Sequence, residues 1–189
     1  PVKEHLANRL KIETSNILML NDAACFLKGE AVAGAGKGYQ HIIGLTLGTG
    51  TGTATYHAGV TLDANLGPSP FMESIADEYF STRWFVNQYL QRSGKQVKDV
   101  KALLDYYATD PQVPALFETF TDNLAVFLKA FIQKENPELI VMGGNISQSA
   151  SLFLPQLITK LKQQEISVPI VQALLGEEAA LLGAASLFH

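Results

Sequence analysis

Three glycines alternate with threonines in the stretch TLGTGTGTAT, residues 46–55, directly after an apolar run. Glycines in a turn between two strands let backbone N–H groups approach a ligand without interference from a Cβ atom, and successive N–H groups form a concave anion site. A phosphate group would suit such a site, with the hydroxyls of Thr49 and Thr51 as further donors. A glycine-rich β-turn that binds nothing would look the same, so this stretch alone leaves both interpretations open.

Neither common nucleotide-binding fingerprint fits these glycines. A dinucleotide loop leads from a strand into a helix, whereas the residues after Gly52 favour a second strand. The other candidate, GAGKGY at 34–39, lacks the Ser or Thr that follows the lysine in a P-loop, and it follows a helix. Lys37 is therefore not a P-loop lysine, and GAGKGY is typical of a helix end and linker.

An acidic residue follows the short apolar run Ile17–Leu20, in the stretch LNDAAC. Sites in open α/β sheets lie beyond the carboxyl ends of strands, so Asp22 could accept a proton from a substrate hydroxyl there. Asn21 or Asp22 could equally cap the helix that follows, which would be a purely structural role.

A second pair of glycines follows another apolar run, in VMGGN at 141–145. Gly143 and Gly144 would let a flat group lie against the backbone at a strand end, or would simply form a tight turn into a helix. Glu177 and Glu178 open the last expected helix, where acidic residues are favoured by the helix dipole, so we interpret them as structural.

Hydrophobic spacing predicts an α/β order of elements. Strands are expected at 17–20, 41–48, 53–59, 138–144 and 167–173, with a short one near 60–62. Helices are expected at 2–10, from 23 to about 33, and at 73–92, 97–107, 112–135, 149–163 and 177–187. One strand cannot make a sheet alone, so residues 1–38 are interpreted as the end of another lobe with its linker, and 39–189 as one lobe.

Composition excludes several classes of protein. The 189 residues carry a formal net charge of −4 with scattered Lys and Arg, so we expect no direct contact with nucleic acid. The sequence has no apolar run of membrane-spanning length and no signal peptide, which favours the cytoplasm and no membrane partner. Cys25 is the one cysteine, which excludes an internal disulfide and a multi-cysteine zinc site. The four histidines have no metal-ligand spacing.

Together these segments resemble the ROK family, the bacterial sugar kinases and sugar-responsive repressors of the actin-like ATPase superfamily. The resemblance is carried, in order, by NDAACFLKGEAVAGAGKGY, LTLGTGTG, LIVMGGNIS and LGEEAALLGAA. It implies a ribonuclease H-like (actin-like ATPase) lobe with a mixed sheet and flanking helices, and ATP-dependent phosphorylation of a hexose or amino-hexose. Mg²⁺ would accompany ATP, and family members commonly form homo-oligomers.

The resemblance also implies a role for individual residues. Asp22 would be the general base, and Asn21, Asp22 and Glu73 would bind the sugar. Gly48, Thr49, Gly50, Thr51 and Gly52 would hold the phosphates, and Gly143, Gly144 and Asn145 would hold the adenosine.

Two departures from the family pattern alter these expectations. Family members usually carry G-E-x-G-H and a cysteine-rich zinc segment where this chain reads GPSPF. Pro68 and Phe71 can replace neither the sugar contacts nor the metal ligands, so we predict no zinc and altered or weaker sugar recognition. The first phosphate loop, D-[IL]-G-G-T, has no counterpart, so this segment alone should not turn over. A repressor portion or a binding-only remnant remains the alternative.

Overall fold

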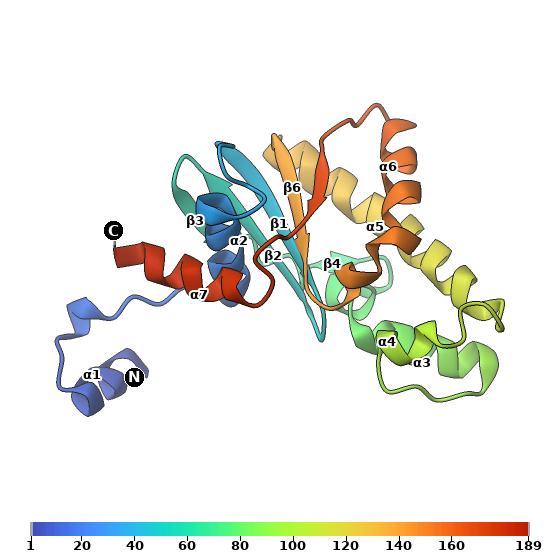
Figure 1. Cartoon of the computed structure of the whole chain (residues 1–189), viewed down its shortest axis with the longest axis horizontal. Coiled ribbons are helices and arrows are strands. Elements are labelled where there is room, and N and C mark those ends of the chain that lie inside the picture. The colour runs from blue at the N-terminus through green and yellow to red at the C-terminus, as the bar shows by residue number, and fades with distance from the viewer. Residues whose placement is uncertain (1, 189) are drawn as a thin grey trace.

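The computed structural model describes residues 2–188 and contains a five-stranded mixed sheet (Figure 1). Its strands are β1 (His41–Leu47), β2 (Thr51–His57), β3 (Val60–Asp63), β6 (Leu139–Gly143) and β7 (Ile170–Gln172). The spatial order is β3-β2-β1-β6-β7, and β1 pairs antiparallel with β2 but parallel with β6. This confirms the predicted mixed sheet, including the hairpin on either side of the glycine turn.

Helices cover both faces of the sheet. On one face lie α2 (Asp22–Ala33) and α7 (Glu178–Ala185), and on the other α5 (Gln112–Glu135) and α6 (Leu154–Lys162) (Figure 1). Side chains alternate along β1, because Ile42 packs with the α2 core whereas Ile43, Leu45 and Leu47 pack with the α5 core. The central strands are therefore buried on both faces, as their continuous apolar sequence indicates.

The larger core is rich in aromatic residues and is completed by α3 (Thr82–Ser93) and α4 (Val100–Leu104). Phe80, Phe85 and Phe120 are fully buried there, and the ring centroids of Phe85 and Phe120 lie 5.0 Å apart. The helix predicted from the apolar stripe of residues 112–135 is present as α5, with the predicted bounds. The helix ends at Asn136, whose positive φ of 48° forms a left-handed cap.

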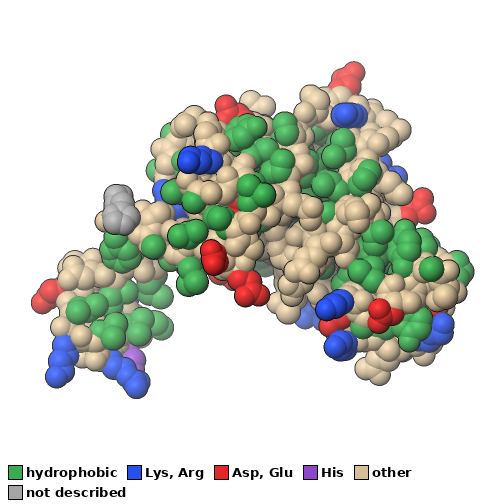
Figure 2. Space-filling view, viewed as in Figure 1, with side chains coloured by type: hydrophobic (Ala, Val, Ile, Leu, Met, Phe, Trp, Pro, Cys, Tyr) green, Lys and Arg blue, Asp and Glu red, His purple; other side chains and the backbone are tan. Residues whose placement is uncertain are grey.

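The predicted strand at 17–20 is wrong. The segment lies between η1 (Thr14–Asn16) and α2 without regular structure and without a partner strand among residues 2–188, and Leu18 and Met19 are exposed. The predicted first helix is present as α1 (Val2–Leu10). It protrudes from the body in Figure 1, and hydrophobic side chains gather on this part of the surface in Figure 2.

The helix predicted at 73–92 begins only at Thr82. Before Thr82 lies a short hairpin, whose two strands are β4 (Pro70–Phe71) and β5 (Ser74–Ile75), followed by η2 (Ala76–Glu78). The Phe71 side chain explains the hairpin, because its ring packs against Tyr79, Phe80 and Phe127 with centroids 5.1 to 5.9 Å away. The hydrophobic residues before Thr82 belong to a loop that packs on the core. Their spacing matches that of a helix, so the sequence pattern alone could not distinguish the two.

The segment predicted as one helix at 149–163 is divided. Residues Ile146–Leu152 form η3, and α6 follows with Pro155 in its first turn.

Helix α2 packs on one face of the sheet, in a core shared with Leu139, Val141 and Ala179. The division of the chain at residue 38 stays a prediction. None of the helices described between residues 2 and 188 is both long enough and apolar enough to cross a lipid bilayer.

Candidate functional site

Two adjoining cavities lie where β1 and β6 end, at the carboxyl edge of the parallel pair. The first, of about 440 Å³, is lined by Asn21, Asp22, Thr46, Gly48, Thr49, Gly50, Thr51, Gly52, Thr53, Asp63, Asn65, Gly67, Pro68, Ile75, Asp77 and Gly144. The second, of about 380 Å³, is lined by Asp22, Ala23, Phe26, Thr46, Gly143, Gly144, Asn145, Ser147, Gln148, Gln172, Ala173, Gly176, Glu177 and Ala180. The cavities share Asp22, Thr46 and Gly144, so a ligand could extend from one into the other.

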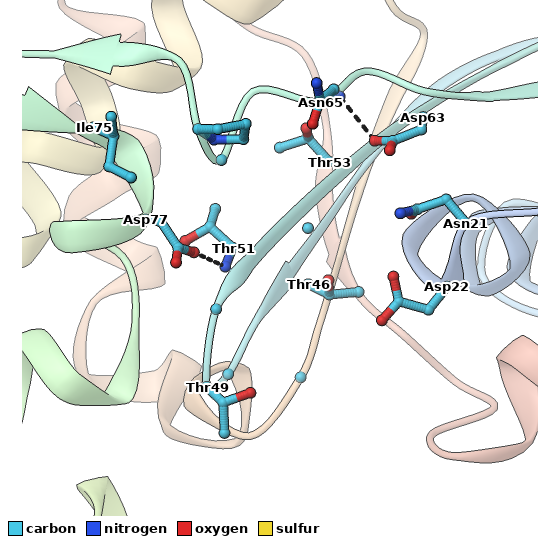
Figure 3. A pocket seen from close by; sticks show the side chains of 16 residues that line it. Asn21, Asp22, Thr46, Thr49, Thr51, Thr53, Asp63, Asn65, Ile75 and Asp77 are labelled. Carbon is cyan, nitrogen blue, oxygen red and sulfur yellow. Dashed lines mark hydrogen bonds between the residues drawn. The ribbon is translucent and has the colours of Figure 1, made fainter.

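The two residues at the start of α2 contact the same backbone amide. The Asn21 side chain caps the helix, because its Oδ1 accepts a hydrogen bond from the backbone N–H of Ala23 at 2.9 Å. Asp22 accepts from the same N–H through its own Oδ1, also at 2.9 Å. Among residues 2–188 the other oxygen of Asp22 accepts no hydrogen bond, and the side chain is exposed and lines both cavities. Figure 3 shows it in the first of them.

The charge of Asp22 acts on its surroundings. Burial raises the pKa of the Cys25 thiol, and the negative charge of Asp22 raises it further. Cys25 therefore remains a neutral thiol at physiological pH, in keeping with a packing role. Asp22 is left exposed, with a carboxylate oxygen that a substrate hydroxyl could reach.

The glycine turn joins β1 to β2 at the floor of the first cavity. Within it the Gly48 N–H donates to the Gly50 carbonyl at 3.0 Å, and Gly52 lies opposite Thr46, where an added Cβ would approach Thr46 Oγ1 to 2.3 Å. The Thr51 hydroxyl is buried and has no hydrogen-bond partner within residues 2–188. The turn is thus packed tightly on its strand side, while its tip borders the cavity (Figure 3).

The second glycine pair forms a tight turn with a wall of the second cavity. Gly144 has a φ of +86°, and an added Cβ would lie 2.4 Å from the Leu47 carbonyl oxygen. An added Cβ on Gly143 would lie 2.5 Å from the Phe26 ring. The turn interpretation therefore holds, because both added Cβ atoms would collide with atoms of the protein, and Gly143, Gly144 and Asn145 also line the second cavity.

Several lining residues were missed by sequence reasoning. Asp63 and Asn65 come from the end of β3 and the loop after it, and Asp77 comes from η2, within the stretch predicted as a long helix. The one signal in the sequence for the first two is that Asp63 and Asn65 are polar and follow directly on the short strand expected near 60–62. Glu73 is exposed and lies outside both sets of lining residues, and its role in sugar binding stays a prediction.

No Lys, Arg or His lines either cavity within the described part of the chain. An anion in these cavities would be met by backbone N–H groups, hydroxyls, its own counter-ion, or groups from outside this segment. No cluster of three or more His, Cys, Asp or Glu side chains that could hold a metal ion occurs among residues 2–188. The question of zinc stays a prediction.

Comparison with known proteins identifies relatives along nearly the whole chain. An N-acetylgalactosamine kinase from a Shewanella species is 27% identical, over 89% of this chain and 64% of its own length. A glucokinase from Thermotoga maritima is 26% identical, over 99% of this chain and 69% of its own. The chain therefore spans roughly two thirds of the length of these relatives.

Solved structures agree in fold. The structure of a ROK family glucokinase from Streptomyces griseus, in complex with glucose and AMPPNP, superposes with a TM-score of 0.81 at 21% identity, covering 99% of this chain and 72% of that one. This likeness confirms the predicted fold class, a lobe with a mixed sheet and flanking helices. The sequence profile of the ROK family matches residues 1–67 and 75–189, so only 68–74 fall between the matched stretches, and the chain belongs to the ROK family.

Proposed function

We propose that this chain is the nucleotide-binding part of an ATP-dependent sugar kinase that phosphorylates a hexose or amino-hexose. One observation carries the proposal: Asp22 and the glycine turn line the same cavity, and Asp22 also borders the cavity formed by Gly143, Gly144 and Asn145. The kinase names of the relatives support it and favour a kinase over a repressor portion or a binding-only remnant.

The sugar and the phosphates of ATP would share the first cavity, and the adenosine would occupy the second. The sugar would occupy the first cavity beside Asn21 and Asp22. The phosphates of MgATP would lie over the glycine turn, and the adenosine would lie against Gly143 and Gly144. Because the cavities share Thr46 and Gly144, the transferred phosphoryl group would lie where they meet.

In the proposed reaction a sugar hydroxyl oxygen bonds to the γ-phosphorus while the bond from that phosphorus to the bridging oxygen breaks and ADP leaves. Asp22 accepts the hydroxyl proton. Phosphoryl transfer depends mainly on positioning and on stabilisation of charge, so we expect it to need the groups of a second lobe as well.

The test is ADP release over a panel of hexoses and amino-hexoses, measured with the full-length protein that carries this chain. Asp22→Asn keeps the shape of the side chain but removes the base, so kcat should fall by about 10²–10⁴-fold. Asp122→Asn is a matched control, because Asp122 is an exposed carboxylate on α5 that pairs with Lys160 outside both cavities. Equal rates for wild type and Asp22→Asn would refute the general-base role, and no ADP release with any sugar would refute the kinase.

A further inference from the structure

The glycine turn is held from its outer side by the segment that leads into α3. The Asp77 carboxylate accepts a hydrogen bond from the Thr51 N–H through Oδ1 at 2.5 Å (Figure 3). Four residues beyond the Asp77–Glu78 pair, the Thr82 N–H donates to the Gly48 carbonyl at 2.7 Å. Both ends of the turn are therefore fixed by one short segment that comes from elsewhere in the sequence.

These bonds determine which amides of the turn remain available. The Gly48 N–H is used by the Gly50 carbonyl and the Thr51 N–H by Asp77. The N–H groups of Thr49 and Gly50 have no partner among residues 2–188. Two consecutive free amides at the tip of a turn that lines a cavity are the donors that an anion would find there.

Asp77 also joins the turn to the opposite wall of the first cavity. Its own N–H donates to the Gly67 carbonyl at 2.9 Å, and an added Cβ on Gly67 would lie 2.5 Å from the Thr51 carbonyl oxygen. An added Cβ on Gly50 would lie 3.1 Å from Asp77 Oδ1. The three segments thus meet closely around this carboxylate, and a change in its position would be transmitted to the turn.

The negative charge of Asp77 near a proposed phosphate site is partly offset. Arg83 Nη2 lies 3.7 Å from Asp77 Oδ2, and it also bonds Glu78 Oε1 at 2.7 Å. The Arg83 side chain is half exposed, so this pairing is weak and solvent-screened. The firm contact of Asp77 is therefore the one to the Thr51 amide.

We propose that Asp77 is a positioning residue that occupies the Thr51 amide and so directs the amides of Thr49 and Gly50 toward the nucleotide phosphates. This inference rests on the proposed function of the cavity. It assigns to Asp77 an effect on nucleotide binding, and it distinguishes that effect from a direct contact with the sugar.

The experiment compares Asp77→Ala, Asp77→Asn and Glu78→Ala in the full-length protein. The dissociation constant of ADP is measured by calorimetry without sugar, and the KM of the accepted hexose is measured separately. Asp77→Ala should weaken ADP binding about tenfold, because the turn loses the hydrogen bond that holds the Thr51 amide. Asp77→Asn retains an oxygen that can accept from Thr51, so it should bind ADP within about twofold of wild type. Glu78→Ala removes the neighbouring carboxylate, which contacts Arg83 but not the turn, and should leave ADP binding unchanged.

Each contrary result has a distinct meaning. Unchanged ADP binding by Asp77→Ala, with a raised KM for the hexose, would overturn the inference in favour of a direct sugar contact. Equal losses in Asp77→Ala and Asp77→Asn would overturn it too, because the charge rather than the bond to the turn would then be responsible. Wild-type protein that binds no ADP would refute the proposed function itself, a result that the variants alone could not give.

Discussion

A buried carboxylate behind the second cavity offers a direct test of how the fold supports the site. Glu30 on α2 is fully buried and accepts three backbone hydrogen bonds, from Ala35 at 2.7 Å, Leu175 at 2.8 Å and Leu174 at 3.2 Å. It thereby ties the end of α2 to the loop between β7 and α7, which includes the cavity residues Gly176 and Glu177.

The expected cost of Glu30→Ala follows from these bonds. Hydrogen bonds to a charged acceptor are worth about 1.5–3 kcal/mol each, and the two shorter ones are partly buried. The long bond to exposed Leu174 should add little. Because water can partly replace the lost partners, we take the lower value for each short bond and expect a loss of about 3 kcal/mol in the free energy of unfolding.

The assay is urea unfolding followed by the fluorescence of Trp84, the single tryptophan, which is buried in the aromatic core beside Phe85 and Phe120. Glu30→Gln keeps one carbonyl oxygen and should lose about half as much stability as Glu30→Ala. Glu118→Ala, an exposed glutamate on α5, is the control and should change stability by less than about 0.5 kcal/mol. A loss for Glu30→Ala no greater than that of the control would refute the reasoning.

Two further predictions concern Gly144 of the second glycine pair and the carboxylate of Asp110. Gly144→Ala should lower the free energy of unfolding by at least about 1–3 kcal/mol and weaken ADP binding, since its φ is +86° and the added Cβ would meet the Leu47 carbonyl. Gly59→Ala, at a φ of +93° with open space around it, is the control, and an equal loss in calorimetry for both would contradict the clash. Hydrogen bonds from Lys95 first, then from the Gln112 N–H and Tyr89, lower the pKa of Asp110 below its ordinary 3.8. The stability that Asp110 contributes is therefore complete above pH 3.8 and is lost as the pH falls through its lower folded-state pKa. Asp110→Asn should reduce the stability at neutral pH and flatten the loss of stability on acidification, measured by urea titrations at a series of pH values. Parallel curves of stability against pH for the variant and the wild type would contradict this.

The sequence predicts best where a local pattern and the fold agree. The run at 41–48, the glycine turn and the return strand appear as β1 and β2 because alternation, β-branched residues and glycines all favour a hairpin. The strand at 17–20 fails for the opposite reason: its apolar residues have no partner strand within residues 2–188, and a pattern cannot supply one.

The candidate site shows the same limit. Asp22 and the glycine turn could be found because each stands at the end of an apolar run. Asp77 could not, since its importance depends on a bond to Thr51 across 26 positions of sequence, which only the folded chain reveals. The sequence indicated only that Phe71 cannot replace a sugar contact or a metal ligand. The structure shows that its ring packs the β4–β5 hairpin onto the core.

The register of β1 has a consequence for how this protein can vary. Thr46 pairs with Gly52 on one side and with Gly143 on the other, so one residue on one strand aligns both glycine segments. Inserting or deleting a residue within β1 would exchange the side chains that face α2 with those that face α5 and would misalign both segments together. Residues 68–74, the stretch that the family profile leaves unmatched, lie outside the five-stranded sheet, and their first residue, Pro68, lines the first cavity. A change in the length of that stretch would leave the pairing of Thr46 with both glycine segments in register.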